Sequence, residues 1–544
     1  MRKHFNNAGP VNKDNMYKID PLKRWELQEV LDLIEKEKYF IMHAPRQTGK
    51  TSCMLALRDY LNKEGKYFAV YVNVEMGQAA KHNTNSSIRA INGALRMRLE
   101  HLNVDENILS QLKKINDEVD VNIALTNAFT CLSSAMSKPV VVFIDEIDAL
   151  IGDSLISVLR QIRSGYDQRP EKFPASIVLC GIRDVRDYRI VSSNNEIITG
   201  GSAFNIKAKS LSIENFSIDE VKELYLQHTT ETGQVFEDDI YDLVMDYTNG
   251  QPWLVNALAN EVVWEMKENR DHSVIITKDK LAEAKERLIL RRDTHLDQLV
   301  DKLKEDRVRN VILPMLLGDE YIPQPDDAKY CIDLGLIKQT RAGLEISNSI
   351  YQEIIPRELT WDEQNNMLAR FKPNWINTDG SLNINTLLTL FKDFWNENST
   401  IWGSNLPGYR EAAPQLVFQA FMQRVINGGG TINREYALGT GQTDLYIKWQ
   451  YEYEKKLCIQ NIVIEIKVIH KNWSYETTKK AAIEQTAHYA KACGEKEAYI
   501  LIFDRENKMK WQADEPNENI EHEGVKLEIW KLGAGIFSQL EIRN

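Results

Sequence analysis

Residues 39–57 decide the fold, and they read YFIMHAPRQTGKTSCMLAL. The apolar run at 39–43 predicts a buried strand, because parallel strands covered on both faces read as continuous apolar runs. The loop that follows matches the phosphate-binding pattern GxxxxGK[ST], except that its first position is Ala44. In such a loop, backbone N–H groups and the positive end of the next helix surround a β-phosphate. The predicted nucleotide contacts are Pro45, Arg46, Gln47, Thr48, Gly49, Lys50, Thr51 and Ser52.

Three residues of this loop have distinct predicted roles. Lys50 bridges to the γ-phosphate, and the Thr51 hydroxyl is a ligand for Mg²⁺. Gly49 accepts a backbone geometry that a side chain would block. The sequence therefore predicts a nucleoside triphosphate with Mg²⁺ at the end of the first strand.

A second carboxylate-bearing motif supports this prediction. Residues 140–146 read VVVFIDE, an apolar strand that ends in Asp145 and Glu146. Asp145 is expected to hold Mg²⁺ through water, and Glu146 to orient or deprotonate the water that attacks the γ-phosphate. ATP is favoured over GTP, because no guanine-reading NKxD motif stands at an appropriate place.

Charged residues follow two further strands. Residues 181–189 read GIRDVRDYR, and Arg183 is the candidate γ-phosphate sensor because it lies nearest the strand end. The alternative is a solvated charge run whose arginines pair with the neighbouring aspartates. His43 and Glu75 also lie near strand ends, and we interpret both as ordinary loop residues.

A second cluster of reactive side chains stands near the C-terminus. Residues 462–467 read IVIEIK, and the alternation of side chains in a strand places Glu465 and Lys467 on one face. Asp444 is expected to open an adjacent strand, so that two carboxylates and an ammonium converge there. We predict Asp444 and Glu465 as ligands for Mg²⁺, with Mn²⁺ as an alternative, and Lys467 as the group that positions or activates water. The predicted chemistry is hydrolysis of phosphodiesters. Gln485 and Tyr489 are four residues apart on a predicted helix, hence on one face.

The first 360 residues resemble the AAA-like ATPases of the STAND and archaeal-ATPase group. The resemblance depends on APRQTGKTS, on the DEID ending of the second motif, on IRDVRDYR and on the later Gly250-Gln251-Pro252-Trp253. It implies that Pro252 contacts the nucleotide from a helical lid, and that a winged helix follows the lid. It also implies a switch with slow hydrolysis rather than a fast motor.

The C-terminal part resembles the PD-(D/E)XK nuclease superfamily, in particular its RecB-like branch with a QxxxY helix. The resemblance implies Asp444 and Glu465 as metal ligands, Lys467 as the catalytic lysine, and Gln485 with Tyr489 as an accessory pair. Glu411 is the candidate for the acidic residue that many members carry on their first helix. Gln442 stands where related ATPase–nuclease fusions have arginine, which implies a weaker grip on the substrate.

The predicted fold class is therefore multidomain α/β: a parallel-sheet P-loop ATPase core with a helical lid and a winged helix, followed by a mixed α/β restriction-endonuclease-like domain. The predicted parts are the ATPase core at 1–210, the lid at 211–304, the winged helix at 305–357, a linker at 358–380 and the nuclease-like domain at 381–544.

Composition limits the partners. The chain has 544 residues and a net charge of −12, which argues against non-specific coating of nucleic acid, so any such contact is expected to be local. The sequence contains no apolar run of membrane-spanning or signal-peptide length, and its six cysteines form no CxxC pair, so we expect a cytoplasmic protein without membrane contact, disulfide framework or zinc cluster. The expected partner is nucleic acid, DNA rather than RNA. A protein trigger and assembly into an oligomer on nucleotide binding are further candidates.

Two alternatives to a nuclease that is controlled by ATP remain open. The C-terminal domain could be a non-catalytic module that recognises nucleic acid or protein under the control of a nucleotide switch. A helicase-type motor is disfavoured, because the sequence shows no second helicase-type core.

Overall fold

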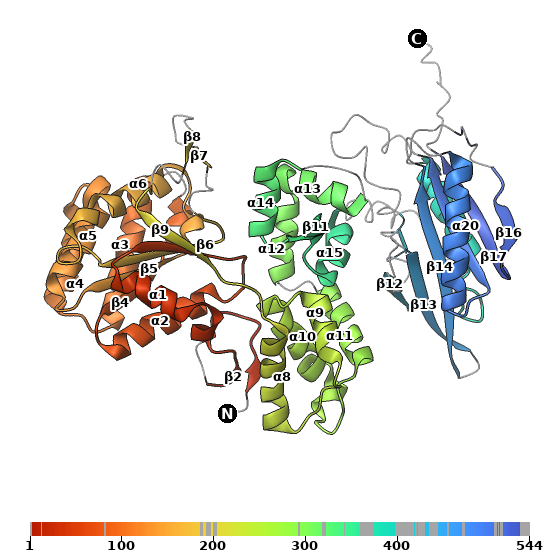
Figure 1. The fold of residues 1–544 in the computed structure, drawn as a ribbon, viewed down its shortest axis with the longest axis horizontal. Helices are drawn as coiled ribbons and strands as arrows, with labels where there is room; N and C mark the ends of the chain where they lie inside the picture. Colours follow the sequence, from red (N-terminus) through yellow and green to blue (C-terminus); the bar gives the residue numbers. More distant parts are fainter. Residues whose placement is uncertain are drawn as a thin grey trace, which may run out of the picture. The chain divides into compact units, whose positions relative to one another are not determined.

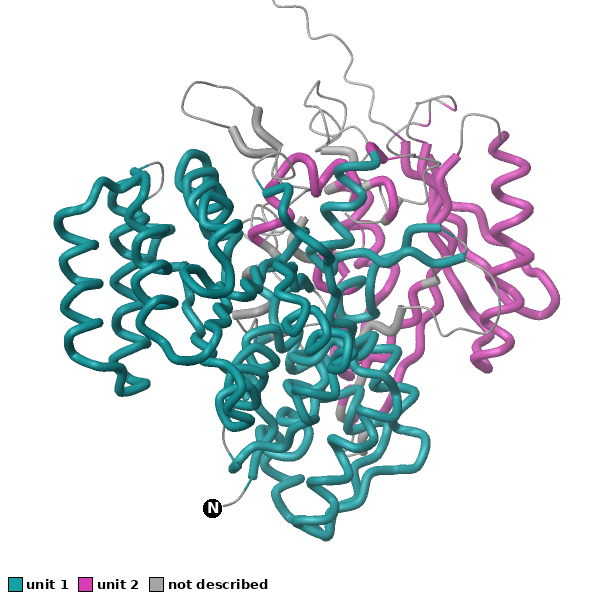
Figure 2. The backbone as a smooth tube through the Cα atoms, turned by 60° about the vertical axis from the view of Figure 1, so that its left-hand side comes forward, with its two compact units in different colours: residues 1–299, 325–352 teal, residues 300–324, 353–544 magenta. Residues whose placement is uncertain are grey.

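The chain divides into two compact units. The first comprises Met1–Leu299 and Pro325–Gln352, and the second comprises Val300–Gln324 and Glu353–Asn544 (Figure 2). The computed structural model describes residues 3–11, 14–80, 83–184, 189–191, 197–199, 204–291, 294–317, 323–341, 343–359, 375–397, 418, 421–422, 430–434, 444–453, 456–469, 474–504, 509, 511 and 515–533.

The first unit is organised by a five-stranded parallel sheet (Figure 1). Its strands in spatial order are β4 (Phe68–Asn73), β5 (Val140–Asp145), β6 (Ser176–Gly181), β3 (Tyr39–His43) and β9 (Lys207–Ser212). All four neighbouring pairs are parallel, so the carboxyl ends of the strands share one edge. The phosphate loop follows β3 and the carboxylate motif ends β5, with β6 between them.

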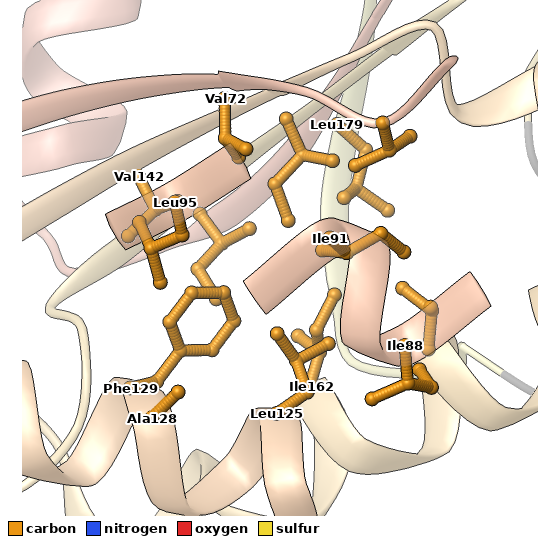
Figure 3. Close-up of a cluster of buried hydrophobic side chains, with 14 of the residues drawn as sticks. Val72, Ile88, Ile91, Leu95, Leu125, Ala128, Phe129, Val142, Ile162 and Leu179 are labelled. Atoms are coloured by element: carbon orange, nitrogen blue, oxygen red, sulfur yellow. The ribbon is translucent and has the colours of Figure 1, made fainter. Parts of the chain in front are cut away.

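Helices cover both faces of this sheet. On one face lie α3 (Thr84–His101), α4 (Glu106–Glu118), α5 (Val121–Ala135) and α6 (Gly152–Ser164). Their apolar side chains, among them Ile91 and Phe129, meet Val72, Val142 and Leu179 of the sheet (Figure 3). On the other face lie α1 (Leu27–Glu35) and α2 (Lys50–Glu64). Burial on both faces explains the continuous apolar runs in the strand sequences.

Short runs rich in apolar residues at 39–43, 67–74, 140–144, 176–180 and 203–208 predict five strands in this region, and the first four lie where these runs indicate. The fifth prediction, residues 203–208, is displaced, because the strand is Lys207–Ser212. Phe204, the largest apolar residue of that run, is buried in the core before the strand begins. Strand β9 itself lies at the edge of the sheet and is half exposed, so it lacks an apolar run.

Helices dominate the chain after the sheet. They are α8 (Ile218–Thr232), α9 (Ile240–Thr248), α10 (Pro252–Asn260), α11 (Lys278–Arg291), α12 (Thr294–Leu303), α13 (Asp306–Leu317), α14 (Pro325–Asp333) and α15 (Ser349–Leu359). Between α14 and α15 stands the antiparallel hairpin of β10 (Ile337–Thr340) and β11 (Gly343–Ile346). Near the N-terminus, β1 (His4–Phe5) pairs in parallel with β2 (Met16–Tyr17). None of the described helices has the length and apolar character needed to cross a bilayer.

The second unit contains a separate mixed sheet of six strands (Figure 1). Its strands in spatial order are β12 (Gly430–Arg434), β13 (Asp444–Tyr453), β14 (Lys456–Val468), β15 (Glu497–Asp504), β17 (Val525–Gly533) and β16 (Glu518–His522). The pairs β12–β13, β13–β14 and β16–β17 are antiparallel, whereas the pairs β14–β15 and β15–β17 are parallel. Helix α20 (Tyr475–Ala492) packs on one face and α17 (Ile384–Glu397) on the other.

Candidate functional site

The phosphate loop is wrapped around the side chain of Lys50. Its Nζ donates hydrogen bonds to the carbonyl oxygens of Ala44 and Pro45, both at 2.8 Å, and the Thr48 hydroxyl donates to Pro45 O at 2.8 Å. The backbone is left-handed at Gln47 (φ 58°) and at Gly49 (φ 96°), where α2 begins. Glycine tolerates this geometry at little cost. The loop therefore holds its curved form, with the helix N-terminus directed at its centre.

Asp145, at the end of β5, forms a direct hydrogen bond with Thr51 of this motif. It is fully buried, and its Oδ2 accepts hydrogen bonds from the hydroxyls of Thr51 (2.7 Å) and Tyr71 (2.9 Å). Its Oδ1 accepts a hydrogen bond from the backbone N–H of Glu146 at 2.9 Å. The structure thus brings Thr51 and Asp145 together, although they are far apart in the sequence.

Glu146 combines unusual backbone geometry with a perturbed acidity. Its φ is 59°, a left-handed conformation that is uncommon for a residue with a side chain. Burial, followed by the charges of Asp148 and Asp145, raises the pKa of Glu146 to about 7, while Lys50 and Arg46 oppose the rise. A carboxyl group that titrates near neutral pH is suited to act as a general base.

A cavity of about 380 Å³ lies over the loop. Its wall includes Lys50, Thr51 and Glu146, and also Pro252 at the start of α10. Glu75, interpreted from the sequence as an ordinary loop residue, also lines it. A volume of several hundred Å³ is within the usual range of small-molecule sites.

The N-terminal segment supplies a wall that the sequence analysis missed. Residues 6–11 line the cavity, and the segment is held by hydrogen bonds from the Trp253 indole to Asn7 O (2.8 Å) and from Val11 N to the Ser52 hydroxyl (2.9 Å). This segment reads NNAGPV and carries no recognisable motif. Its place follows from the packing of Phe5 against the lid, which only the folded chain reveals.

The lid contacts the loop through the residue before Pro252. The Gln251 side-chain amide donates to Arg46 O at 3.3 Å, while its oxygen accepts from Leu254 N at 2.6 Å and caps α10. The GQPW turn therefore lies at the nucleotide cavity, and Gln251, which the sequence analysis did not select, is the residue that touches the loop backbone.

Segment 325–352 approaches the same loop from another side. Gly335 (φ 77°) lies so close to Pro45 that an added Cβ would come within 2.9 Å of the proline Cβ. The guanidinium of Arg183 lies 4.9 Å from the ring centre of Tyr330 in α14. Among the described residues, the cavity wall does not include Arg183, so its role as a phosphate sensor stays a prediction.

The donor set around Asp145 fits a magnesium ion. Thr51 and Asp145 offer hydroxyl and carboxylate oxygens beside the phosphate loop, and Mg²⁺ prefers such oxygen ligands together with phosphate and water. Among the described residues, here or at any other place, no group of three or more His, Cys, Asp or Glu side chains could hold a metal ion.

The C-terminal candidates meet on the face of the second sheet that α20 covers. Ile464 and Ile466 of β14 belong to the core on the α17 side, so the alternating residues Glu465 and Lys467 lie on the opposite face. Glu465 is fully buried and forms an ion pair with the Nζ of Lys467. The same Nζ donates a hydrogen bond to Gln485 Oε1 of α20 at 2.9 Å.

Backbone register places Asp444 at the same point. In the register of β13 and β14, Asp444 is the direct antiparallel partner of Glu465. Tyr489 lies one turn beyond Gln485 and packs against the core beneath α20. The side chain of Asp444, and the whole of Glu411 and Gln442, lie outside the described part.

The first unit is thus a P-loop ATPase-like fold, defined by a parallel sheet with a phosphate loop after β3 and a carboxylate pair after β5. No family model matches the chain, and no curated protein matches it. Solved structures that resemble it include a Walker-type ATPase of Pyrococcus abyssi (12% identity, TM-score 0.45, 64% of this chain and 99% of that chain). Others are Cdc6p of Pyrobaculum aerophilum (13%, 0.36, 63% and 96%) and the Holliday junction branch migration motor RuvB of Thermotoga maritima (12%, 0.32, 64% and 98%).

Proposed function

We propose that the chain is an ATP-binding and ATP-hydrolysing switch that controls a metal-dependent nuclease carried in its own C-terminal part. The observation that carries the ATPase half is the hydrogen bond from Thr51 to Asp145, since it joins the two motifs at the carboxyl edge of one sheet. The observation that carries the nuclease half is the register of Asp444 opposite Glu465, with Lys467 on the same face.

In the ATPase site, Lys50 exchanges its hydrogen bonds to the loop carbonyls for the β- and γ-phosphates of ATP. Thr51 and Asp145 would hold Mg²⁺, and the ion would supply positive charge to the phosphates. Glu146 takes the proton of the attacking water, and its elevated pKa makes it an effective base near neutral pH. Pro252 of the proposed lid contacts the adenine ring of ATP.

In the C-terminal site, Asp444 and Glu465 would hold Mg²⁺ or Mn²⁺, and the ion would supply Lewis-acid polarisation of the phosphodiester. Lys467, held by its hydrogen bond to Gln485, positions the attacking water and stabilises the extra negative charge that develops on the phosphoryl oxygens. Gln485 and Tyr489 contact the substrate phosphate. The substrate is nucleic acid, DNA rather than RNA.

Control of cleavage by nucleotide is inferred from the fusion of both sites in one chain. A bacterial defence or mobile-element setting suits such a fusion, with a protein trigger and nucleotide-dependent oligomer formation as further elements of the proposal.

The test uses the full chain with single- and double-stranded DNA and RNA, Mg²⁺ or Mn²⁺, with and without ATP. We expect metal-dependent cleavage that is lost in Asp444→Ala, Glu465→Ala and Lys467→Ala variants that still fold. The response of cleavage to ATP should disappear in Lys50→Ala. Absence of cleavage under every condition would leave a nucleotide switch with a recognition module. Cleavage that ignores both ATP and Lys50→Ala would remove the control and keep the nuclease.

A further inference from the structure

The hydroxyl of Tyr71 is a third group at the junction of the two ATPase motifs. Tyr71 lies on β4, which neither motif includes, and β4 pairs in parallel with β5 so that Asn73 is opposite Asp145. The Tyr71 ring is 4% exposed, and its hydroxyl donates to Asp145 Oδ2 at 2.9 Å. That oxygen therefore receives two hydroxyl donors, one from Thr51 and one from Tyr71.

The Thr51 and Tyr71 hydroxyls differ in their access to the cavity. Thr51 lies on the cavity wall, and its oxygen is the one that would ligate Mg²⁺. A hydroxyl that gives a lone pair to a metal still donates its hydrogen, but its position then follows the metal. Tyr71 is not part of the cavity wall among the described residues, so its donor is fixed by the protein alone.

The surroundings of Tyr71 keep its hydroxyl a donor. The buried Asp145 carboxylate can only accept, so the Tyr71 phenol keeps its hydrogen and donates it to Oδ2. The guanidinium of Arg98, on α3, lies over the Tyr71 ring at 5.4 Å from its centre, a cation–π contact that helps to hold the ring. A rigid, permanently protonated donor sets the plane of the carboxylate that it binds.

We propose that Tyr71 is a positioning residue for the Mg²⁺ of the ATPase site. It fixes the Asp145 carboxylate so that the water-mediated contact to the ion needs no rearrangement when Mg²⁺·ATP enters. The inference rests on the proposed ATPase function and adds to it a residue that acts through Asp145 without touching the nucleotide.

Tyr39 provides a matched control. It is also a buried tyrosine on a strand of the same sheet, its hydroxyl donates to Pro174 O at 2.9 Å, and Arg169 lies 5.0 Å from its ring centre. Tyr39 begins β3, whereas the motifs stand at the opposite ends of the strands. Removing either hydroxyl should lower the free energy of unfolding by a similar amount, but only the loss of the Tyr71 hydroxyl should change the Mg²⁺ requirement.

The experiment compares Tyr71→Phe, Tyr39→Phe and the unmodified full chain. Binding of a fluorescent ATP analogue is measured with Mg²⁺ and with EDTA, and ATPase rates are measured across a Mg²⁺ titration. We expect Tyr71→Phe to raise the Mg²⁺ concentration for half-maximal activity about tenfold, the scale of a lost hydrogen bond to a charged group. Metal-free nucleotide affinity should change less than about twofold, and Tyr39→Phe should alter neither quantity.

The outcomes separate the two proposals. A Tyr71→Phe titration that matches Tyr39→Phe overturns the inference and leaves the ATPase intact. If the unmodified chain shows no Mg²⁺-dependent nucleotide binding, both fall together. If circular dichroism shows Tyr71→Phe unfolded, Tyr71→para-aminophenylalanine restores a donor of the same shape. Its Mg²⁺ requirement should stay near that of the unmodified chain, and a tenfold rise would count against the role assigned to the donor.

Discussion

Two carboxylates, Asp145 in the first unit and Glu465 in the second, are both fully buried at the edge of a predicted site. Asp145 accepts three hydrogen bonds, so its charge is compensated before any ligand arrives. Within the described residues, neither oxygen of Glu465 accepts a hydrogen bond, and its charge is met by the ion pair with Lys467. A single ion pair compensates a buried carboxylate less fully than three hydrogen bonds do, and a bound metal ion would lower the remaining cost. The first site is arranged to orient a ligand, and the second to attract one.

The largest expected effect is on nucleotide turnover. Lys50→Ala removes the ammonium that we expect to bind the transferred phosphate, and loss of such a group lowers turnover by about 100-fold or more. ATP hydrolysis by purified protein measures it. Lys63→Ala, in the exposed last turn of the same helix, is the control and should leave the rate unchanged. A Lys50→Ala rate within about threefold of the control would contradict the role of this loop.

A pair of amide substitutions tests the comparison directly. Asp145→Asn leaves one acceptor oxygen, which can keep the Thr51 and Tyr71 hydrogen bonds as weaker neutral ones, but it places an NH2 group against the Glu146 N–H, so it should cost about 1–3 kcal/mol of local stability. Glu465→Gln weakens a single ion pair, and the Lys467 ammonium keeps its hydrogen bond to Gln485, so the loss should be smaller, within about 1 kcal/mol. Hydrogen exchange in peptides from β5 and β14, in metal-free and nucleotide-free protein, measures each effect locally.

Metal supplies the control for this pair. Adding Mg²⁺ without nucleotide should slow exchange in β14 of the unmodified chain, because an ion that binds the folded state stabilises it. The same addition should have no effect in Glu465→Gln. Equal destabilisation by both amides, with no response of β14 to Mg²⁺, would show that the two carboxylates do not differ in the way described.

Sequence patterns predicted the motif-bearing parts of both units. The run at 39–57 identified β3, the loop and the start of α2, because an apolar strand, a glycine with positive φ and a helix N-terminus follow one another directly. Period-two alternation likewise assigned Glu465 and Lys467 to the face opposite Ile464 and Ile466.

Contacts between segments distant in sequence could not be predicted in this way. Tyr71 reaches Asp145 only because β4 and β5 pair in one register, and residues 6–11 reach the cavity only through packing of Phe5 on the lid. The pairing of Asp444 with Glu465 also depends on a strand register, which alternation alone does not determine, since a slip of one residue would move a side chain to the other face.

The pH dependence of ATP hydrolysis tests whether Glu146 is the general base of the first site. Glu146 titrates at about 7, so the ionised, basic form is scarce below that pH and predominates above it. We expect kcat/KM for ATP to rise about tenfold per pH unit below 7 and to level off above it. The sign for stability is the reverse: a carboxyl whose pKa is raised on folding disfavours the folded state as the pH rises from about 4.5 to 7.

Glu146→Gln serves as the control for this profile. It should remove most activity and the acid limb together, because the amide has no basic form. A residual rate in Glu146→Gln that keeps the same limb near pH 7 would assign the titration to another group, with Glu75 on the cavity wall the first to examine.

The smallest effect is expected where the lid meets the loop. Gln251→Ala removes both the cap of α10 and the contact with Arg46 O, so it should lower stability by about 1 kcal/mol and ATP affinity a few-fold. Ser217→Ala is matched to it, since Ser217 caps α8 in the same lid by accepting from Glu220 N at 3.2 Å, without contacting the loop. Thermal unfolding should show a similar loss for both variants. Calorimetric titration with ATP should show weaker binding in Gln251→Ala alone, because only there is a contact between lid and loop lost. Equal affinities in the two variants would mean that Gln251 stabilises its helix and contributes nothing to the nucleotide site.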